Sequence, residues 1–186
     1  YIEQHDHYIK QTYRNRCTIA GPDGELALSI PTVKPDTLKC PMKDIRISDH
    51  GNWRHLHWNA IESAYNNTPF FEYYKDDFRP FYEKKYEFLI DFNEEICRLV
   101  CQLIDIQPNI ERTSAYKMEF SAEETDFRES IHPKKDFRTT DPEFTPQPYY
   151  QVFESKLGFL PNLSIIDLLF NMGPESLLVL NKPTRL

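Results

Sequence analysis

Two apolar stripes run through residues 81–106, and they constrain the fold more than any other feature of the sequence. Both stripes follow helical spacing, in which residues three or four positions apart share one face. The first stripe contains Tyr82, Tyr86, Leu89, Ile90, Cys97, Val100, Cys101 and Ile104. The second contains Phe88, Phe92, Ile96, Leu99 and Leu103. A helix that is apolar on two sides must be covered on both, so residues 81–106 are predicted to form the central helix.

The N-terminal part of the chain predicts a β-hairpin. Residues 11–19 and 25–31 alternate between apolar and polar side chains, and the sequence Gly-Pro-Asp-Gly at 21–24 lies between them. Proline sets φ, aspartate hydrogen-bonds locally and glycine accepts positive φ, so these four residues are typical of a turn. Residues 44–48 alternate in the same way and predict a third strand, and 113–120 and 149–153 are further candidates.

Further helices are expected on either side of the central one. Residues 53–66 repeat large side chains every four positions, at Trp53, His57, Ile61 and Tyr65. Residues 70–77 predict a short helix that ends near a proline.

The C-terminal part carries helix-boundary signals. Ser164 is expected to cap a helix with Asp167 as its capping-box partner. Gly173 is expected to end that helix, and Pro174 to open another at its first position.

These elements predict one α/β domain over residues 1–186, with a mixed sheet that includes the N-terminal hairpin and is flanked by the central and C-terminal helices. An α+β arrangement is the alternative, because the first hairpin is antiparallel and the strands cluster early. Residues 121–148 are charged and contain four prolines, so we expect a long loop or lid there. The chain begins at Tyr1, and we expect that native residues precede it.

Composition excludes several function classes. The 5 glycines form neither a dinucleotide-binding nor a P-loop pattern, so any phosphate must be held by side chains. A net charge of −7 disfavours nucleic-acid binding. No apolar run approaches the roughly 18 residues of a membrane span. The 4 cysteines form no C-x-x-C motif, which predicts a reduced, cytoplasmic protein.

Arg14 and Arg16 are the first candidate binding residues. In a strand they point the same way, and no acidic residue lies between Lys10 and Arg16 in an otherwise acidic chain. Two guanidinium groups on one face suit a phosphate or carboxylate, whereas the alternative is a solvated strand face paired with acids.

His57 is a candidate general base, because it lies on the apolar stripe of the predicted helix 53–66. The alternative is a histidine that is simply hydrogen-bonded in place. His5, His7 and Asp6 share no recognised ligand spacing with it, so no metal site is assigned, and the sequence identifies no cofactor.

Asn93 and Asp167 each interrupt an apolar helical face. Such polar groups must be satisfied by protein, water or ligand. Asp167 is therefore a second catalytic candidate, with the capping box as the alternative explanation.

Four motifs occur in one order along the chain: Tyr13-Arg14-Asn15-Arg16, Leu28-Ser29-Ile30-Pro31, His57-Trp58-x-x-Ile61 with Tyr65, and Leu163-Ser164-Ile165-Ile166-Asp167-Leu168-Leu169-Phe170-Asn171. Together they resemble the WbqC-like protein family over nearly the whole chain, and the last motif is the most specific. The resemblance implies a set of functional positions, namely Arg14, Asn15, Arg16, His57, Tyr65, Asp167 and Asn171. Residues 121–148 depart from the family pattern, which has a second regular helical unit there.

The resemblance also implies a link to surface-polysaccharide or amino-sugar biosynthesis, since the family is named for a member encoded among O-antigen genes. We therefore expect an enzyme that transfers a group, such as an acyl group, to an anionic, phosphate-bearing or nucleotide-linked substrate. His57 and Asp167 would be catalytic, and the remaining five positions would bind substrate. Self-association is an open option.

The rival interpretation is a non-catalytic partner protein of the same pathway. It would bind other proteins through aromatic surface supplied by Tyr73, Tyr74, Phe78, Phe81, Tyr149 and Tyr150.

Overall fold

The computed structural model describes residues 1–37 and 39–181 and contains helices around a two-stranded antiparallel sheet. The first elements are β1 (Arg16–Gly21), β2 (Gly24–Ser29), η1 (Met42–Asp44), η2 (His50–Asn52), α1 (Trp53–Tyr65), α2 (Phe71–Phe78) and α3 (Pro80–Glu83). They are followed by α4 (Leu89–Leu103), α5 (Phe137–Thr140), α6 (Glu154–Leu157), α7 (Ile165–Met172), η3 (Gly173–Glu175) and α8 (Ser176–Leu180). The expected mixed α/β composition is confirmed, with a sheet formed by the N-terminal hairpin.

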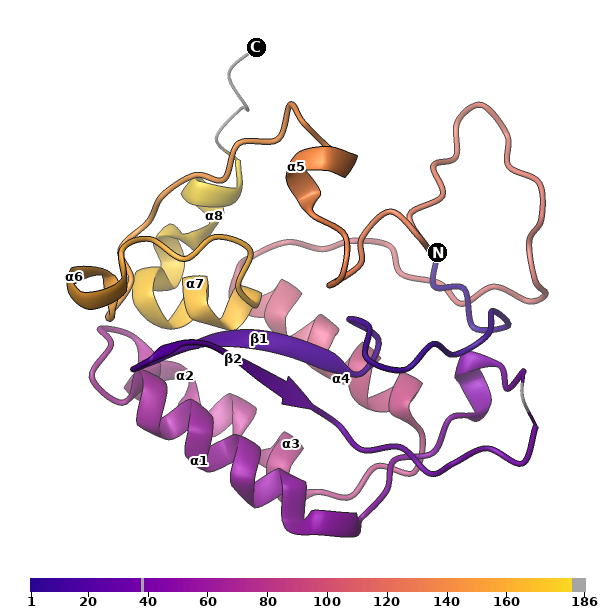
Figure 1. The fold of residues 1–186 in the computed structure, drawn as a ribbon, viewed down its shortest axis with the longest axis horizontal. Helices are drawn as coiled ribbons and strands as arrows, with labels where there is room; N and C mark the ends of the chain where they lie inside the picture. The colour runs from indigo at the N-terminus through magenta and orange to yellow at the C-terminus, as the bar shows by residue number, and fades with distance from the viewer. Residues whose placement is uncertain (38, 182–186) are drawn as a thin grey trace.

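The hairpin passes through the middle of the molecule (Figure 1). Its register pairs Arg16 with Ser29 and closes at Gly21 and Gly24, as the turn sequence predicts. Strand β1 contacts α1 on one side and α7 on the other, so a two-stranded ribbon is covered by helices. Such cover is needed because an isolated hairpin is barely stable in water.

The central helix begins later than its apolar stripes predict. Helix α4 starts at Leu89, and α3 ends at Glu83, because residues 84–88 are not helical and the chain around Phe88 pairs with residues 45–47. The amide of Ile47 donates to the carbonyl of Glu87 at 2.9 Å, and the amide of Leu89 donates to that of Ile45 at 2.9 Å. Tertiary backbone pairing therefore overrides helical periodicity over this stretch.

The other expected strands do not form as regular elements. Residues 44–48 make single bridges, Thr32 with Ile47 and Arg46 with Phe88. Residues 113–120 and 149–153 form no strand. The side chain of Gln151, and not a neighbouring strand, pairs with the backbone of Leu160. Its Nε2 donates to the Leu160 carbonyl at 2.9 Å, and its Oε1 accepts the Leu160 backbone N–H at 2.8 Å.

Two buried clusters form the core. One joins the hairpin, α1, α2, α7 and the end of α4, and Phe170 lies within it, with ring centroids of Tyr65, Phe71 and Phe78 at 5.2, 5.2 and 5.3 Å. The other joins the start of α1 to α3, η1 and the start of α4. Phe78 and Phe81, proposed as exposed partner-binding residues, are buried in these clusters, whereas Tyr73 and Tyr150 are exposed.

Long irregular segments lie outside this core. Residues 121–148 contain only the short helix α5 among the described elements, and Figure 1 shows much of the stretch between α4 and α5 extending away from the helices. None of the described helices is long and apolar enough to cross a membrane.

Gly173 is a position where only glycine fits. Its φ is +56°, and a Cβ there would lie 2.5 Å from Cδ1 of Phe70. We expect Gly173→Ala to lower the free energy of unfolding by about 4 kcal/mol, since backbone strain and overpacking each cost about 2 kcal/mol. Urea unfolding followed by tryptophan fluorescence measures this loss.

Gly158→Ala is the matched control. Gly158 has φ +71°, and an added Cβ would meet nothing within 4 Å. Gly158→Ala should therefore lower the free energy of unfolding only by the cost of backbone strain, about 2 kcal/mol. Equal losses for the two variants would contradict the role of the Phe70 contact.

Candidate functional site

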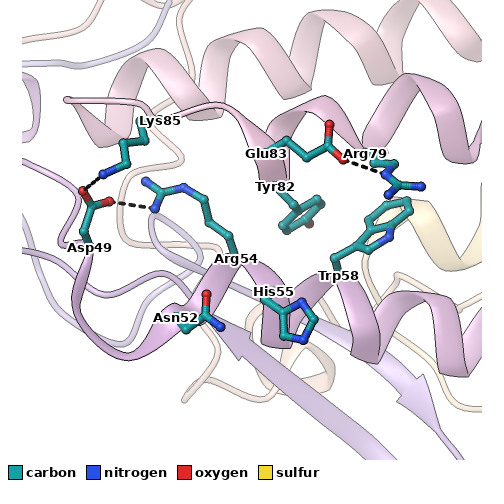
Figure 2. Close-up of a pocket in the computed structure, with 9 residues that line it drawn as sticks. All are labelled: Asp49, Asn52, Arg54, His55, Trp58, Arg79, Tyr82, Glu83 and Lys85. Carbon is teal, nitrogen blue, oxygen red and sulfur yellow. Dashed lines mark hydrogen bonds and ion pairs between the residues drawn. The ribbon is translucent and has the colours of Figure 1, made fainter.

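A cavity of about 420 Å³ opens where the N-terminal end of α1 meets α3 and the loop that follows it (Figure 2). It is lined by Asp49, Asn52, Arg54, His55, Trp58, Arg79, Tyr82, Glu83 and Lys85. Three cations face two carboxylates, so the lining carries a net charge of +1 in a chain of net charge −7.

Aromatic rings form one part of this cavity. The ring centroids of Trp58 and Tyr82 lie 5.7 Å apart, and Tyr82 also packs against Trp53 at 6.5 Å. Burial raises the pKa of Tyr82, which keeps its hydroxyl protonated at neutral pH. The two rings are tilted by 39° to each other and form an uncharged part of the cavity wall between the two charged ends.

Arg54 is the most unusual side chain of the cavity. It is only 14% exposed, and its guanidinium carbon lies 4.8 Å from the ring centroid of Trp53. Nη1 donates to Oδ1 of Asp49 at 2.7 Å, but the buried atoms Nε and Nη2 have no hydrogen-bond partner among the residues that the structure describes. Buried donors without partners are rare in native proteins and suggest a ligand or an ordered water.

The other cations lie at the two ends of the cavity. Lys85 donates to Oδ2 of Asp49 at 2.7 Å, and Arg79 donates to Glu83 at 2.7 Å (Figure 2). Helix α1 begins at the Lys85 end, and the side chain of its N-cap residue Asn52 makes no capping hydrogen bond. The positive end of the helix dipole adds to the attraction of an anion.

His57 lies next to this cavity without lining it. Its ring centroid is 5.1 Å from that of Trp53 and 6.4 Å from that of Tyr82. Burial lowers its pKa to about 4, and a hydrogen bond with the Ser29 backbone partly opposes this shift. The imidazole is therefore neutral at pH 7.

The structure places the three residues 14–16 outside the cavity and gives each a protein partner. Arg14 pairs with Asp6 at 2.9 Å, and Nε of Arg16 donates to the hydroxyl of Ser29 at 2.9 Å. The side-chain amide of Asn15 donates to the carbonyl of Ile30 at 2.9 Å. Arg16 and His57 thus both reach Ser29, whereas Arg14 is directed to the N-terminal segment.

The remaining predicted site residues, Tyr65 and Asn171, both contact Asp167, which is fully buried in α7. Its carboxylate accepts from the hydroxyls of Tyr65 at 2.8 Å and Tyr149 at 2.7 Å, and from the amide of Gln151 at 3.2 Å. Asn171 donates to the Asp167 carbonyl at 2.7 Å and accepts the amide of Val152 at 3.1 Å.

The expected capping box at Ser164 does not form. The Ser164 side chain makes no cap hydrogen bond, and the Asp167 carboxylate points into the core instead. Burial raises the pKa of Asp167, and its three side-chain donors partly oppose that shift. The carboxylate consequently joins α1, α7 and the segment around Tyr149.

Sequence reasoning did not identify the three cations of the cavity. Arg54, Arg79 and Lys85 lie at helix ends and in a loop, where the sequence alone predicts that charged residues are solvated surface. The only available signal was that Arg54 and Trp58 lie four residues apart on one helix. Across the described residues, no group of three or more His, Cys, Asp and Glu side chains is placed to hold a metal ion.

The Asp167 network predicts unequal effects for its two tyrosines. The Tyr65 hydroxyl also accepts the buried amide of Ala20 at 3.2 Å, so Tyr65→Phe leaves two buried groups short of a partner. We expect Tyr65→Phe to lower the free energy of unfolding by about 3 kcal/mol and Tyr149→Phe by about 1 kcal/mol. Urea denaturation of both variants tests this order, and equal losses would be inconsistent with it.

His57 predicts a pH dependence of stability. Its pKa is about 4 in the folded chain and about 6.5 in the unfolded one, so between these values the unfolded state binds more protons. The contribution of His57 is therefore fully present above pH 6.5 and lost as the pH falls toward 4. We expect the wild-type curve to fall more steeply than that of His57→Gln between pH 6.5 and 4 in urea unfolding, and parallel curves would contradict this assignment.

Comparisons with known proteins place the chain in a family. It is 24% identical over 189 aligned residues to an uncharacterised protein of Mycobacterium tuberculosis, and the alignment covers 91% of this chain and 81% of the relative. No solved structure matches the chain significantly. The model of the WbqC-like protein family matches residues 2–131, which include the whole cavity lining but neither Asp167 nor Asn171. This match extends over more than half of the sequence, and the chain therefore belongs to the WbqC-like protein family.

Proposed function

We propose that this protein binds a phosphate-bearing or nucleotide-linked sugar in the cavity beside α1 and transfers a group to it, as a cytoplasmic enzyme of surface-polysaccharide or amino-sugar metabolism. The observation that carries the proposal is the buried Arg54 guanidinium with two unpartnered nitrogens. Arg79 and Lys85 accompany it, and the rings of Trp58 and Tyr82 lie between the charged ends.

The cavity suits such a ligand in charge, shape and size. Arginine binds phosphate oxygens through two parallel N–H donors, and Nε with Nη2 forms such a pair. A sugar or base ring packs favourably on aromatic faces such as that of Trp58. The volume of about 420 Å³ lies within the usual range of small-molecule sites.

The proposed chemistry is acyl transfer to an amino group. The amine nitrogen attacks the acyl carbonyl, the N–C bond forms as the bond to the leaving group breaks, and the amine proton passes to the leaving group. His57 packs beside the cavity against Trp53 and Tyr82, so for a direct role its neutral ring would have to move to the amine, where it would accept a hydrogen bond. With a pKa of about 4 it is a weak base, so we propose that it orients the amine more than it holds the proton.

The remaining predicted positions have supporting roles in this proposal. Asp167 holds Tyr65 and Tyr149 in place, and Asn171 fixes the backbone around Val152. Arg14 and Arg16 would have to exchange Asp6 and Ser29 for a ligand in order to bind it. Closure of residues 121–148 over the site stays a prediction.

Binding of a uridine diphosphate hexosamine tests the proposal. We expect isothermal titration calorimetry to detect binding by the wild type and a loss of at least about 10-fold in affinity for Arg54→Ala, because a charge-assisted pair of hydrogen bonds contributes about 1.5–3 kcal/mol. His57→Ala should retain binding and lose turnover once an acyl donor is found.

Arg46→Ala is the matched control. Arg46 is exposed, forms an ion pair of 3.0 Å with Glu87, and does not line the cavity. Affinity should be unchanged in this variant. Equal losses for Arg46→Ala and Arg54→Ala, or no binding by the wild type, would overturn the assignment of the cavity.

A non-catalytic partner protein is the second candidate, and one observation favours it. The segment after Arg112 exposes several large apolar side chains, with exposed fractions of 50% for Tyr116, 81% for Met118, 61% for Phe127 and 66% for Ile131. Exposed apolar clusters often mark protein-binding surface. Absence of sugar-nucleotide binding in the experiment above would favour this second function.

A further inference from the structure

Asp49 occupies an unusual place in the cavity, because its carboxylate bridges two of the three cations. Oδ1 accepts from Nη1 of Arg54 at 2.7 Å, and Oδ2 accepts from Nζ of Lys85 at 2.7 Å. The Asp49 side chain is itself 53% exposed. A carboxylate is thus held at the cavity edge where the proposed phosphate would meet the same two cations (Figure 2).

The fold makes little use of this carboxylate. Asp49 precedes η2 but makes no side-chain cap hydrogen bond to it. Among the described residues, its side chain pairs only with Arg54 and Lys85. Exposed ion pairs of this kind contribute little to stability, so the arrangement is not explained by folding.

Arg54, in contrast, is held in place without Asp49. Its guanidinium packs over the Trp53 ring at 4.8 Å, and its side chain is 14% exposed. Release of the carboxylate would therefore leave the cation where it is. Nη1 would then join Nε and Nη2 as a free donor.

We propose that Asp49 is a built-in competitor for the ligand's phosphate: its carboxylate occupies Arg54 and Lys85 in the empty protein and must move away when the phosphate binds. This inference rests on the proposed function, and it adds a residue that sets the affinity of the same site. Lys85 and Arg54 hold the pKa of Asp49 below its usual value, so the competing carboxylate is ionised at neutral pH.

The proposal also restricts the ligand. Exchange of one carboxylate for another leaves the charge on Arg54 and Lys85 unchanged, whereas a phosphate monoester or diphosphate brings a second negative charge and a third oxygen. The phosphate can therefore displace Asp49 from Nη1 of Arg54 and from Nζ of Lys85.

Titration of inorganic pyrophosphate into Asp49→Asn, Asp49→Ala and the wild type tests the inference. We expect both variants to bind pyrophosphate about fivefold more tightly, since a competing charge 2.7 Å from both cations is removed. Thermal unfolding checks that the variants remain folded. Glu87→Gln controls for net charge, because Glu87 is exposed and pairs with Arg46 outside the cavity lining, and its affinity should equal that of the wild type.

The outcomes separate this inference from the function on which it rests. The first outcome is that both Asp49 variants bind pyrophosphate as weakly as the wild type or more weakly, while Arg54→Ala abolishes wild-type binding. This outcome would overturn the competitor role and leave the cavity assignment intact. It would show that Asp49 positions Arg54. Equal tightening by Glu87→Gln would reduce the effect to net charge and also overturn the role. Absence of pyrophosphate binding in the wild type and in both Asp49 variants would overturn the cavity assignment itself.

Discussion

The buried carboxylate of Asp167 is the interaction on which the arrangement of the helices depends. An ionisable group with no exposed surface is costly unless donors surround it, and Tyr65, Tyr149 and Gln151 supply them. Tyr65 also accepts the amide of Ala20 and so links β1 to the same network. Helices α1 and α7 therefore hold the hairpin between them by a specific polar contact in addition to apolar packing, which by itself is not directional.

The position of α1 in turn determines the cavity. Its buried face joins both core clusters, through Trp53 in one and Trp58 with Ile61 in the other. Its first two turns bring Arg54 and Trp58 to the side where α3 presents Tyr82 and Glu83. The same packing that buries Trp53 also supplies the ring on which the Arg54 guanidinium lies. Site and core are thus built from consecutive residues of one helix.

The sequence identified much of the local structure. The hairpin with its Pro-Asp turn, helices α1 and α2, and the end of α7 at Gly173 all follow from turn chemistry and periodicity. The resemblance also singled out Tyr65, Asp167 and Asn171, and the structure places these three in one network, whereas their functional roles stay predictions. The sequence did not identify the non-helical break at 84–88, because the partner segment 45–47 is distant in sequence. It also did not identify the side-chain pairing of Gln151 with Leu160, because no apolar periodicity signals such a contact.

What the sequence determined alone is therefore what short-range physics controls: φ preferences at glycine and proline, the spacing of apolar side chains, and the need to satisfy a polar residue inside an apolar helix. The tertiary structure decided where charge gathers. Asp49, Arg54, Arg79 and Lys85 are ordinary surface residues when read along the chain, and they form one cavity only because α1 and α3 pack together. Coulomb interactions act through space at distances of a few ångströms, so a site made of such residues exists only after the fold has brought them together.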